Sequence, residues 1–309
     1  MKHILKSQQF SRQEIEKLFA DTDHIRGLYE DPEKKKGLMT SLQGKTMFAI
    51  FYEPSSRTRF SFCSAAANLG MIPIWTEDAG KFSSAVKGET LEDSIHAFCQ
   101  YDPSVIVLRH SEVGAAEKAA KIVDQFGYET SIINAGDGKG QHPTQALLDL
   151  YTIKREIGRL DDITVVVGGD LANGRTVRSL VYLLSKFERI QFVFLSPDNL
   201  KMGDDIINHL KEHDIKFTET ENMKEALRVA DIIYWTRVQT ERGSINDTVD
   251  LTIGVEEMYL VKSGARLMHP LPRVGEIKTE IDHDSRSAYF RQIKNGKFTR
   301  MALLEDVCR

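Results

Sequence analysis

The sequence contains few cysteines and no long hydrophobic run. Its three cysteines among 309 residues, Cys63, Cys99 and Cys308, are far apart and form no C-x-x-C pair. Cys63 and Cys99 fall in apolar helical stretches, where a buried reduced thiol is expected rather than a ligand or nucleophile. No apolar stretch approaches the roughly 20 residues of a membrane span, and the N-terminal segment lacks the apolar core of a signal peptide. We therefore expect a soluble protein of a reducing, cytoplasmic compartment with no membrane partner.

An excess of basic residues is also missing. The chain has 41 lysines and arginines against 45 acidic residues, a net charge of −4, which argues against a general nucleic-acid binder. Hydrophobic residues make up 41% and charged residues 28%, values typical of a globular protein with real cores. Because 309 residues exceed the usual size of one core, two domains are expected.

From about residue 45 onward, short β-rich runs alternate with amphipathic helical patterns. Strands are expected at 46–52, 72–76, 104–109, 131–134, 163–169, 190–196 and 231–236. Helices are expected at 57–69, 90–101, 114–126, 143–157, 175–187, 203–212 and 222–229. This alternation predicts an α/β fold made of two doubly wound parallel-sheet domains. The glycine cluster at 136–140 is the candidate hinge, and two final helical segments, 285–294 and 298–307, need not belong to the second domain.

The most informative segment is 51–60, FYEPSSRTRF. A buried strand ends at Glu53, and a helical pattern begins after Ser55 or Ser56, which places a serine at the helix N-cap. Free backbone N–H groups and the helix dipole favour an anion at such a position. The two hydroxyls and the guanidinium fork of Arg57 complete a phosphate cradle without a glycine-rich loop.

Three further candidates lie in the first half of the chain. Arg109 comes directly at the end of a buried strand, where open α/β sheets bind ligands. His142 follows a glycine turn and precedes Pro143, a residue suited to the first helical position, so its side chain projects from the helix start. The polar stretch 80–94, with Lys87 before a helix start capped by Thr90, is predicted to be a flexible, lysine-bearing loop.

The second half contains three candidate segments. In 168–176, GGDLANGRT, the glycine spacing is not G-x-G-x-x-G, so a dinucleotide site is poorly supported and Arg175 at the helix start becomes the feature of interest. Arg237 ends another apolar strand, with Gln239 two residues on. In 269–272, HPLP, two prolines fix the backbone and leave carbonyls free to accept hydrogen bonds from an amine.

Four arginines therefore lie at strand ends or helix starts: Arg57, Arg109, Arg175 and Arg237. Arginines are poor core residues, and chance placement of all four at the ligand edges of two sheets is improbable. They indicate substrates that carry several negative charges.

In this order the segments resemble the aspartate/ornithine carbamoyltransferase family, from its S-x-R-T-R phosphate motif at 55–59 through H-P-x-Q at 142–145 to 269–272. The resemblance spans about residues 45–300. It implies a carbamoyl-phosphate-binding domain at 1–141, to which a C-terminal helix at 290–309 returns, and an aspartate-binding domain at 142–289. It also implies an active site in the interdomain cleft, no cofactor or metal, and a homotrimer with sites shared between subunits. Whether a separate regulatory subunit joins the trimer is left open.

The resemblance assigns roles residue by residue. The phosphate would be bound by Ser55, Ser56, Arg57, Thr58 and, from the adjacent subunit, Ser83 and Lys87. The carbamoyl group would be bound by Thr58, Arg109, His142 and Gln145. The aspartate carboxylates and amine would be bound by Lys87, Arg175, Arg237, Gln239 and the carbonyls of Pro270 and Leu271. The residues implied to be catalytic are Arg57, Thr58, Lys87, Arg109 and His142.

The acceptor is expected to be L-aspartate, giving N-carbamoyl-L-aspartate and phosphate in pyrimidine biosynthesis. Ornithine-specific members typically have an S-M-G segment and H-C-L-P, whereas this chain lacks S-M-G and has HPLP at 269–272. Three alternatives stay open: a carbamoyltransferase acting on another amine, such as ornithine, N-acetylornithine or a ureidoglycine-type acceptor; a nucleotide-binding dehydrogenase that uses the glycines at 168–174; and an inactive family member with a regulatory or scaffold role.

Overall fold

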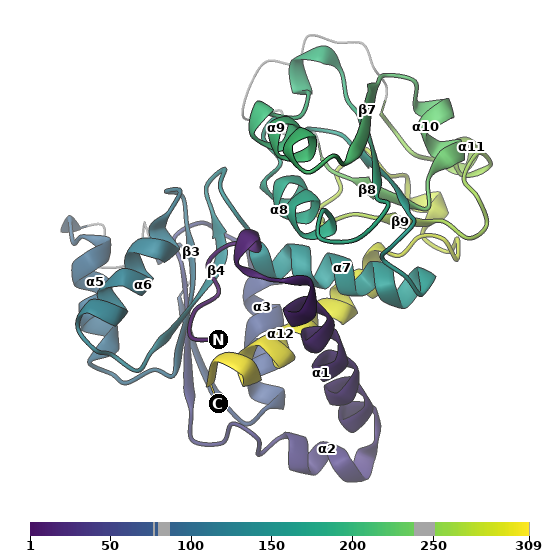
Figure 1. The fold of residues 1–309 in the computed structure, drawn as a ribbon. Helices are drawn as coiled ribbons and strands as arrows, with labels where there is room; N and C mark the ends of the chain where they lie inside the picture. The colour runs from purple at the N-terminus through teal and green to yellow at the C-terminus, as the bar shows by residue number, and fades with distance from the viewer. Residues whose placement is uncertain (77, 80–86, 238–250, 309) are drawn as a thin grey trace. The chain divides into compact units, whose positions relative to one another are not determined.

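The computed structural model describes residues 1–76, 78–79, 87–237 and 251–308 (Figure 1). The chain divides into two compact units, Met1–Leu148 with Lys294–Arg309 and Asp149–Ile293. The division falls inside helix α7 (Pro143–Ile157), after the position 141/142 expected from the glycine cluster, and again inside helix α12 (Tyr289–Cys308). None of the helices in the described ranges is long and apolar enough to cross a membrane.

The first unit is built on a parallel four-stranded sheet in the order β2-β1-β3-β4. Its strands are β1 (Thr46–Phe51), β2 (Ile72–Thr76), β3 (Val105–His110) and β4 (Ser131–Asp137). Its helices are α1 (Arg12–Glu30), α2 (Pro32–Leu38), α3 (Ser56–Asn68), α5 (Leu91–Cys99), α6 (Ala115–Gln125) and the ends of α7 and α12 that belong to this unit. Helices α5 and α6 cover one face of the sheet, and α1, α3 and α12 lie on the other (Figure 1).

The amino-acid composition of these strands follows from how deeply each strand is buried. The central strands β1 and β3 are apolar almost throughout because both of their faces are covered. Strand β2 lies at the edge, and most of its side chains are exposed. At the N-terminus, Ile4 forms an isolated parallel bridge with Ile133, and Ser11 caps α1 by accepting the Glu14 N–H.

The second unit contains a parallel five-stranded sheet in the order β7-β6-β5-β8-β9. Its strands are β5 (Thr164–Gly168), β6 (Gln191–Leu195), β7 (Lys216–Thr220), β8 (Ile232–Trp235) and β9 (Arg266–Met268). Its helices include α8 (Arg175–Leu184), α9 (Asp204–Glu212), α10 (Met223–Val229) and α11 (Val255–Met258). Two parallel sheets flanked by helices confirm the α/β, two-domain fold class.

The C-terminal helix expected at 290–309 is α12, which runs unbroken from Tyr289 to Cys308 across the gap between the helical segments 285–294 and 298–307 that the local pattern indicated. The apparent break at Gly296 reflects packing, since a Cβ there would lie 2.9 Å from Leu148 Cδ2 and 2.8 Å from Arg300 Nη1. In the local sequence, a glycine that allows close packing cannot be distinguished from a glycine that ends a helix.

Candidate active site

The start of α3 is free to receive an anion. Ser55 is the N-cap residue, but its hydroxyl does not cap the helix, and the first turn contains no acidic residue. The backbone N–H groups of that turn therefore keep the positive end of the helix dipole uncompensated by a side chain.

Arg57 lies in this first turn and is exposed. It makes no hydrogen bond or ion pair with the residues that the structure describes, and nearby protein atoms lower the pKa of its guanidinium by partial desolvation. Thr58 beside it is only 7% exposed. Arg59 contrasts with Arg57, because it is 3% exposed and packs 4.4 Å from the centroid of the Trp75 ring. The two arginines of the motif therefore have different environments.

Arg109 is brought to the same edge of the sheet by strand pairing. Its strand β3 pairs with β1 so that Phe51 is opposite Arg109, and the Tyr52 N–H donates to the Arg109 carbonyl at 2.8 Å. The Arg109 guanidinium donates to the Ala135 carbonyl at 3.1 Å and lies 3.5 Å from a carboxylate oxygen of Glu53. Glu53 was not among the predicted site residues, although it lies just after the carboxyl end of β1, as Arg109 lies near the carboxyl end of β3.

His142 is placed by a turn built around Asp137. Asp137 accepts the N–H groups of Gln141 at 2.5 Å and Gly114 at 2.9 Å, one with each carboxylate oxygen. Helix α7 then begins at Pro143, as predicted, and His142 before it is 4% exposed. The side chain of Gln145 is half-buried one turn further on. The carboxyl ends of β1, β3 and β4 thus bring together the predicted residues of the first unit.

The loop residues are described only in part. Lys87 is exposed and makes no hydrogen bond or ion pair with any residue in the described ranges. Ser83 and Gln239 lie outside the described residues. Their assigned roles stay predictions.

In the second unit, Arg175 is the first residue of α8, whose first turn also has no acidic residue. The preceding glycines serve packing: a Cβ on Gly168 would lie 2.2 Å from the Trp235 ring, and one on Gly169 2.2 Å from the Thr236 carbonyl oxygen. Close packing between β5 and β8 accounts for this glycine pair without a dinucleotide.

Arg237 and the 269–272 segment follow the neighbouring strands β8 and β9. The carbonyls of Pro270 and Leu271 accept no hydrogen bond from the residues that the structure describes. Leu271 has φ +56°, in the left-handed region that non-glycine residues rarely adopt. The carboxyl ends of β5, β8 and β9 thus carry a second group of predicted residues, with two arginines and two carbonyls that no described residue bonds.

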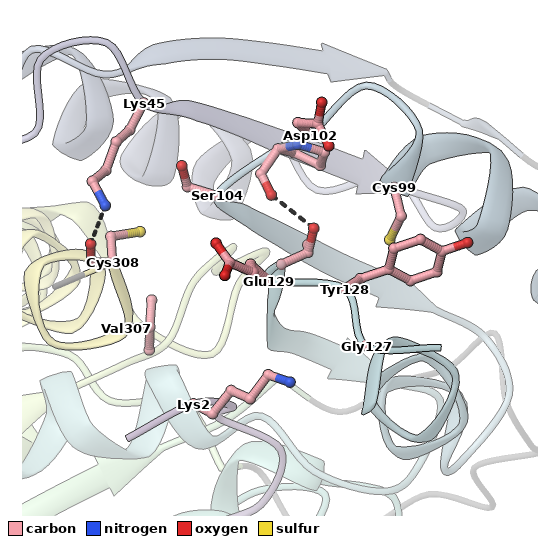
Figure 2. A pocket seen from close by; sticks show the side chains of 12 residues that line it. Lys2, Lys45, Cys99, Asp102, Ser104, Gly127, Tyr128, Glu129, Val307 and Cys308 are labelled. Atoms are coloured by element: carbon pink, nitrogen blue, oxygen red, sulfur yellow. Dashed lines mark hydrogen bonds between the residues drawn. The ribbon is translucent and has the colours of Figure 1, made fainter. Parts of the chain in front are cut away.

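A separate cavity of about 810 Å³ lies near the amino ends of β1, β3 and β4 (Figure 2). Figure 2 shows Lys45 bonded to the Cys308 carbonyl on one side and Tyr128 beside Cys99 on another. Burial raises the pKa of the Cys308 thiol to about 11, so this thiol is protonated at neutral pH. None of the predicted site residues lines this cavity.

Comparison with known proteins identifies the class. A family model described as the carbamoyl-P binding domain of aspartate/ornithine carbamoyltransferases matches residues 2–155, and the model of the Asp/Orn binding domain of the same family matches residues 161–307. The chain therefore belongs to the aspartate/ornithine carbamoyltransferase family, as the sequence predicted.

Three similar proteins indicate which members of the family this chain resembles. The chloroplastic aspartate carbamoyltransferase of Oryza sativa subsp. japonica is 45% identical over 311 residues, which cover 98% of this chain and 84% of the relative. The aspartate carbamoyltransferase catalytic subunit of Aliivibrio fischeri (strain MJ11) is 40% identical over 307 residues, covering 98% and 95%. The structure of Trypanosoma cruzi aspartate transcarbamoylase with carbamoyl phosphate and aspartate aligns with a TM-score of 0.91 at 36% identity, covering 100% of this chain and 97% of that one.

Proposed function

We propose that this chain is an enzyme that transfers the carbamoyl group of carbamoyl phosphate to L-aspartate, giving N-carbamoyl-L-aspartate and phosphate. Its relatives are aspartate carbamoyltransferases, and the similar Trypanosoma cruzi enzyme was solved with both substrates. This supports aspartate over ornithine and N-acetylornithine as the acceptor, and it supports a role in pyrimidine biosynthesis. The observation that carries the proposal is Arg57, an exposed arginine with no partner among the described residues, in the first turn of an uncapped helix.

The first unit would bind carbamoyl phosphate. The hydroxyls of Ser55 and Ser56 and the first-turn N–H groups of α3 would donate hydrogen bonds to the phosphate oxygens, and Arg57 would neutralise their charge. When the aspartate nitrogen attacks the carbamoyl carbon, negative charge develops on the carbamoyl oxygen, and Thr58, Arg109 and His142 are the proposed donors to it. Gln145 is the proposed partner of the carbamoyl NH₂ group.

The second unit would bind aspartate. Arg175, Arg237 and Gln239 are proposed to bind its two carboxylates, and the free carbonyls of Pro270 and Leu271 to accept hydrogen bonds from its amine. A neutral amine then forms the new C–N bond as the C–O bond to phosphate breaks. The leaving phosphate takes the proton that the nitrogen loses, so no protein base or covalent nucleophile is needed. Orientation and electrostatics supply the catalysis.

We further propose a homotrimer in which Ser83 and Lys87 complete the site of a neighbouring subunit. An apolar surface supports such an interface, since Phe60, Ile72, Ile74 and Trp75 are each more than half exposed on and beside edge strand β2. A separate regulatory subunit is an open addition to this trimer. The three unpaired cysteines support a reducing, cytoplasmic location, and the net charge of −4 supports a small-molecule enzyme rather than a nucleic-acid binder.

The test is formation of a ureido product from carbamoyl phosphate, with aspartate and ornithine offered in separate reactions without added metal or nucleotide. Product with aspartate alone is expected. Product with ornithine would contradict the roles of Arg175, Arg237 and the 269–272 segment. No product with either acceptor would favour another amine or an inactive family member.

A further inference from the structure

A chain of buried hydrogen bonds runs through the second unit. The Tyr234 hydroxyl donates to Asp149 Oδ2 at 2.8 Å, and Gln292 Nε2 donates to Asp149 Oδ1 at 2.6 Å. Gln292 Oε1 in turn accepts the His269 N–H at 3.1 Å. All four residues are at most 2% exposed, and they come from α7, β8, α12 and the segment after β9. Elements far apart in the sequence are thus joined through one carboxylate and one amide.

The chain of bonds continues into the segment that ends β9. The Leu271 N–H donates to His269 Nδ1 at 2.8 Å, so the proton of this imidazole is on Nε2, which donates to Glu276 Oε1 at 2.9 Å. The other Glu276 oxygen accepts the N–H groups of Val274 and Gly275, each at 2.9 Å. Burial would raise the pKa of Glu276, but these hydrogen bonds lower it to about 2. Glu276 is therefore an ionised anchor at neutral pH.

These bonds hold a backbone conformation that needs support. Leu271 has φ +56°, a left-handed conformation that is strained for a residue with a Cβ. Its N–H is fixed by His269, whose own N–H is fixed by Gln292. Among the described residues, no donor bonds to the carbonyls of Pro270 and Leu271, and their direction is set by this backbone conformation. Without these bonds the strained backbone would relax, and the two carbonyls would change direction.

The other end of the same chain of bonds lies on β8, the strand that precedes Arg237. Tyr234 precedes Arg237 by three residues, and the Thr176 side chain next to Arg175 also hydrogen-bonds to the Tyr234 hydroxyl. Burial and the Asp149 carboxylate raise the pKa of Tyr234 well above its usual value, so the hydroxyl stays protonated and continues to donate.

We propose that Asp149, Gln292 and His269 are positioning residues for the acceptor substrate. They hold the carbonyls of Pro270 and Leu271 in the direction that accepts hydrogen bonds from the amine of aspartate, and they do not touch the substrate themselves. This inference rests on the proposed function. A fully bonded buried polar network contributes mainly by fixing a unique geometry, because the desolvation of its charged groups offsets much of its stabilisation.

The experiment compares Gln292→Ala with Ser287→Ala in the wild-type background. Gln292→Ala cuts the network between Asp149 and His269. Ser287→Ala also removes a buried hydrogen bond next to α12, from its hydroxyl to the Ile281 carbonyl at 2.8 Å, but this bond lies outside the network. We expect Gln292→Ala to raise the KM for aspartate about tenfold with little change in the KM for carbamoyl phosphate, because misdirected carbonyls lose at least one hydrogen bond to the amine. Ser287→Ala should change neither KM.

A second variant gives a readout that lost stability alone would not produce. Gln292→Glu keeps the acceptor for the His269 N–H but puts a second carboxyl beside Asp149, and one of the two must be protonated to restore the donor. Its KM for aspartate, divided by the wild-type value at each pH, should therefore fall as the pH is lowered from 9 toward 6.

The outcomes separate the two hypotheses. A wild-type chain that makes no product with aspartate overturns the proposed function and the premise of this inference. A wild-type chain that is active, with Gln292→Ala and Ser287→Ala showing the same KM for aspartate, overturns the inference alone. If Gln292→Ala does not fold, Tyr234→Phe and the pH series of Gln292→Glu decide, and a KM for aspartate that stays at the wild-type value in both rejects the proposal.

Discussion

Arg57→Ala separates catalysis from folding more sharply than any other substitution in this chain. Arg57 is exposed, is bonded to none of the described residues, and lies in the first turn of α3, where the helix dipole opposes a cation. The native fold therefore gains nothing from its guanidinium. The proposed reaction, in contrast, needs that guanidinium against the phosphate and the charge that develops on it.

The two effects have opposite signs. A cation at a helix N-terminus costs about 0.3–1 kcal/mol, so the variant should unfold with an unchanged or slightly higher free energy. A hydrogen bond to a charged group contributes about 1.5–3 kcal/mol, and the guanidinium fork can make two to phosphate. Removing a preorganised donor of this kind typically lowers kcat by about 10²–10³-fold, which is the loss that we expect.

Three measurements on the purified chain check this. Ureido product is followed at saturating substrates, and unfolding is followed in urea with and without inorganic phosphate. Phosphate at about 100 times its Kd should raise the stability of the wild type by about 2.7 kcal/mol, and Arg57→Ala should lose most of this gain. The control is Arg59→Ala, two residues along the same helix. It removes a 3%-exposed side chain that packs on Trp75 and should lower stability.

Two results would refute the reasoning. Turnover of Arg57→Ala within a few-fold of wild type would remove Arg57 from the phosphate site. A variant that is less stable without ligand would mean that Arg57 supports the fold, and its loss of activity would then say nothing about chemistry.

The other predictions concern the assembly and pH. Mixed Arg57→Ala and Lys87→Ala chains, each inactive alone, should recover about a quarter of wild-type activity after random subunit exchange, because one shared site in four then has both residues; no recovery despite proven exchange would place each site within one chain. Glu276→Gln should lower the unfolding free energy by about 3 kcal/mol at pH 7, since its carboxylate, with a pKa of about 2, stabilises the fold above pH 4.5. That difference should shrink between pH 4.5 and 2 in acid titrations, and a constant difference would contradict it.

The candidate site was predictable where local chemistry decides position. An arginine at the end of an apolar strand must lie at the carboxyl edge of a parallel sheet, so Arg109 and Arg237 could be assigned before their neighbours were known. Arg57 and Arg175 follow equally from helix starts, which N-cap residues and glycines mark in the sequence. Glu53, the partner of Arg109, could be identified only from the register of β1 against β3, because its position in the sequence indicates only the end of a strand.

Long-range packing explains what local patterns did not predict. The glycine at 296 inside α12 is explained by Leu148, far away in the sequence, which occupies the space that a side chain at 296 would need. Strands β7 and β9 were not expected, because β7 is an edge strand with few apolar residues and β9 has only three residues. The hydrogen bonds of Asp149 join α7 to β8 and α12, and no spacing in the sequence reveals such a connection.

The helix starts of this chain indicate how the fold accommodates its substrates. Helices α1, α5 and α9 have acidic residues in their first turns, as the helix dipole favours, whereas α3 and α8 have none and carry Arg57 and Arg175 there instead. Helices α7 and α12 also have no acidic residue in their first turns, so this feature alone does not mark a ligand site. The proposed function assigns an anionic group to both α3 and α8, phosphate to α3 and carboxylate to α8. At α3, where Arg57 is bonded to none of the described residues, the cation costs about 0.3–1 kcal/mol, and a bound phosphate would offset this cost with the negative charge that it brings to the helix start.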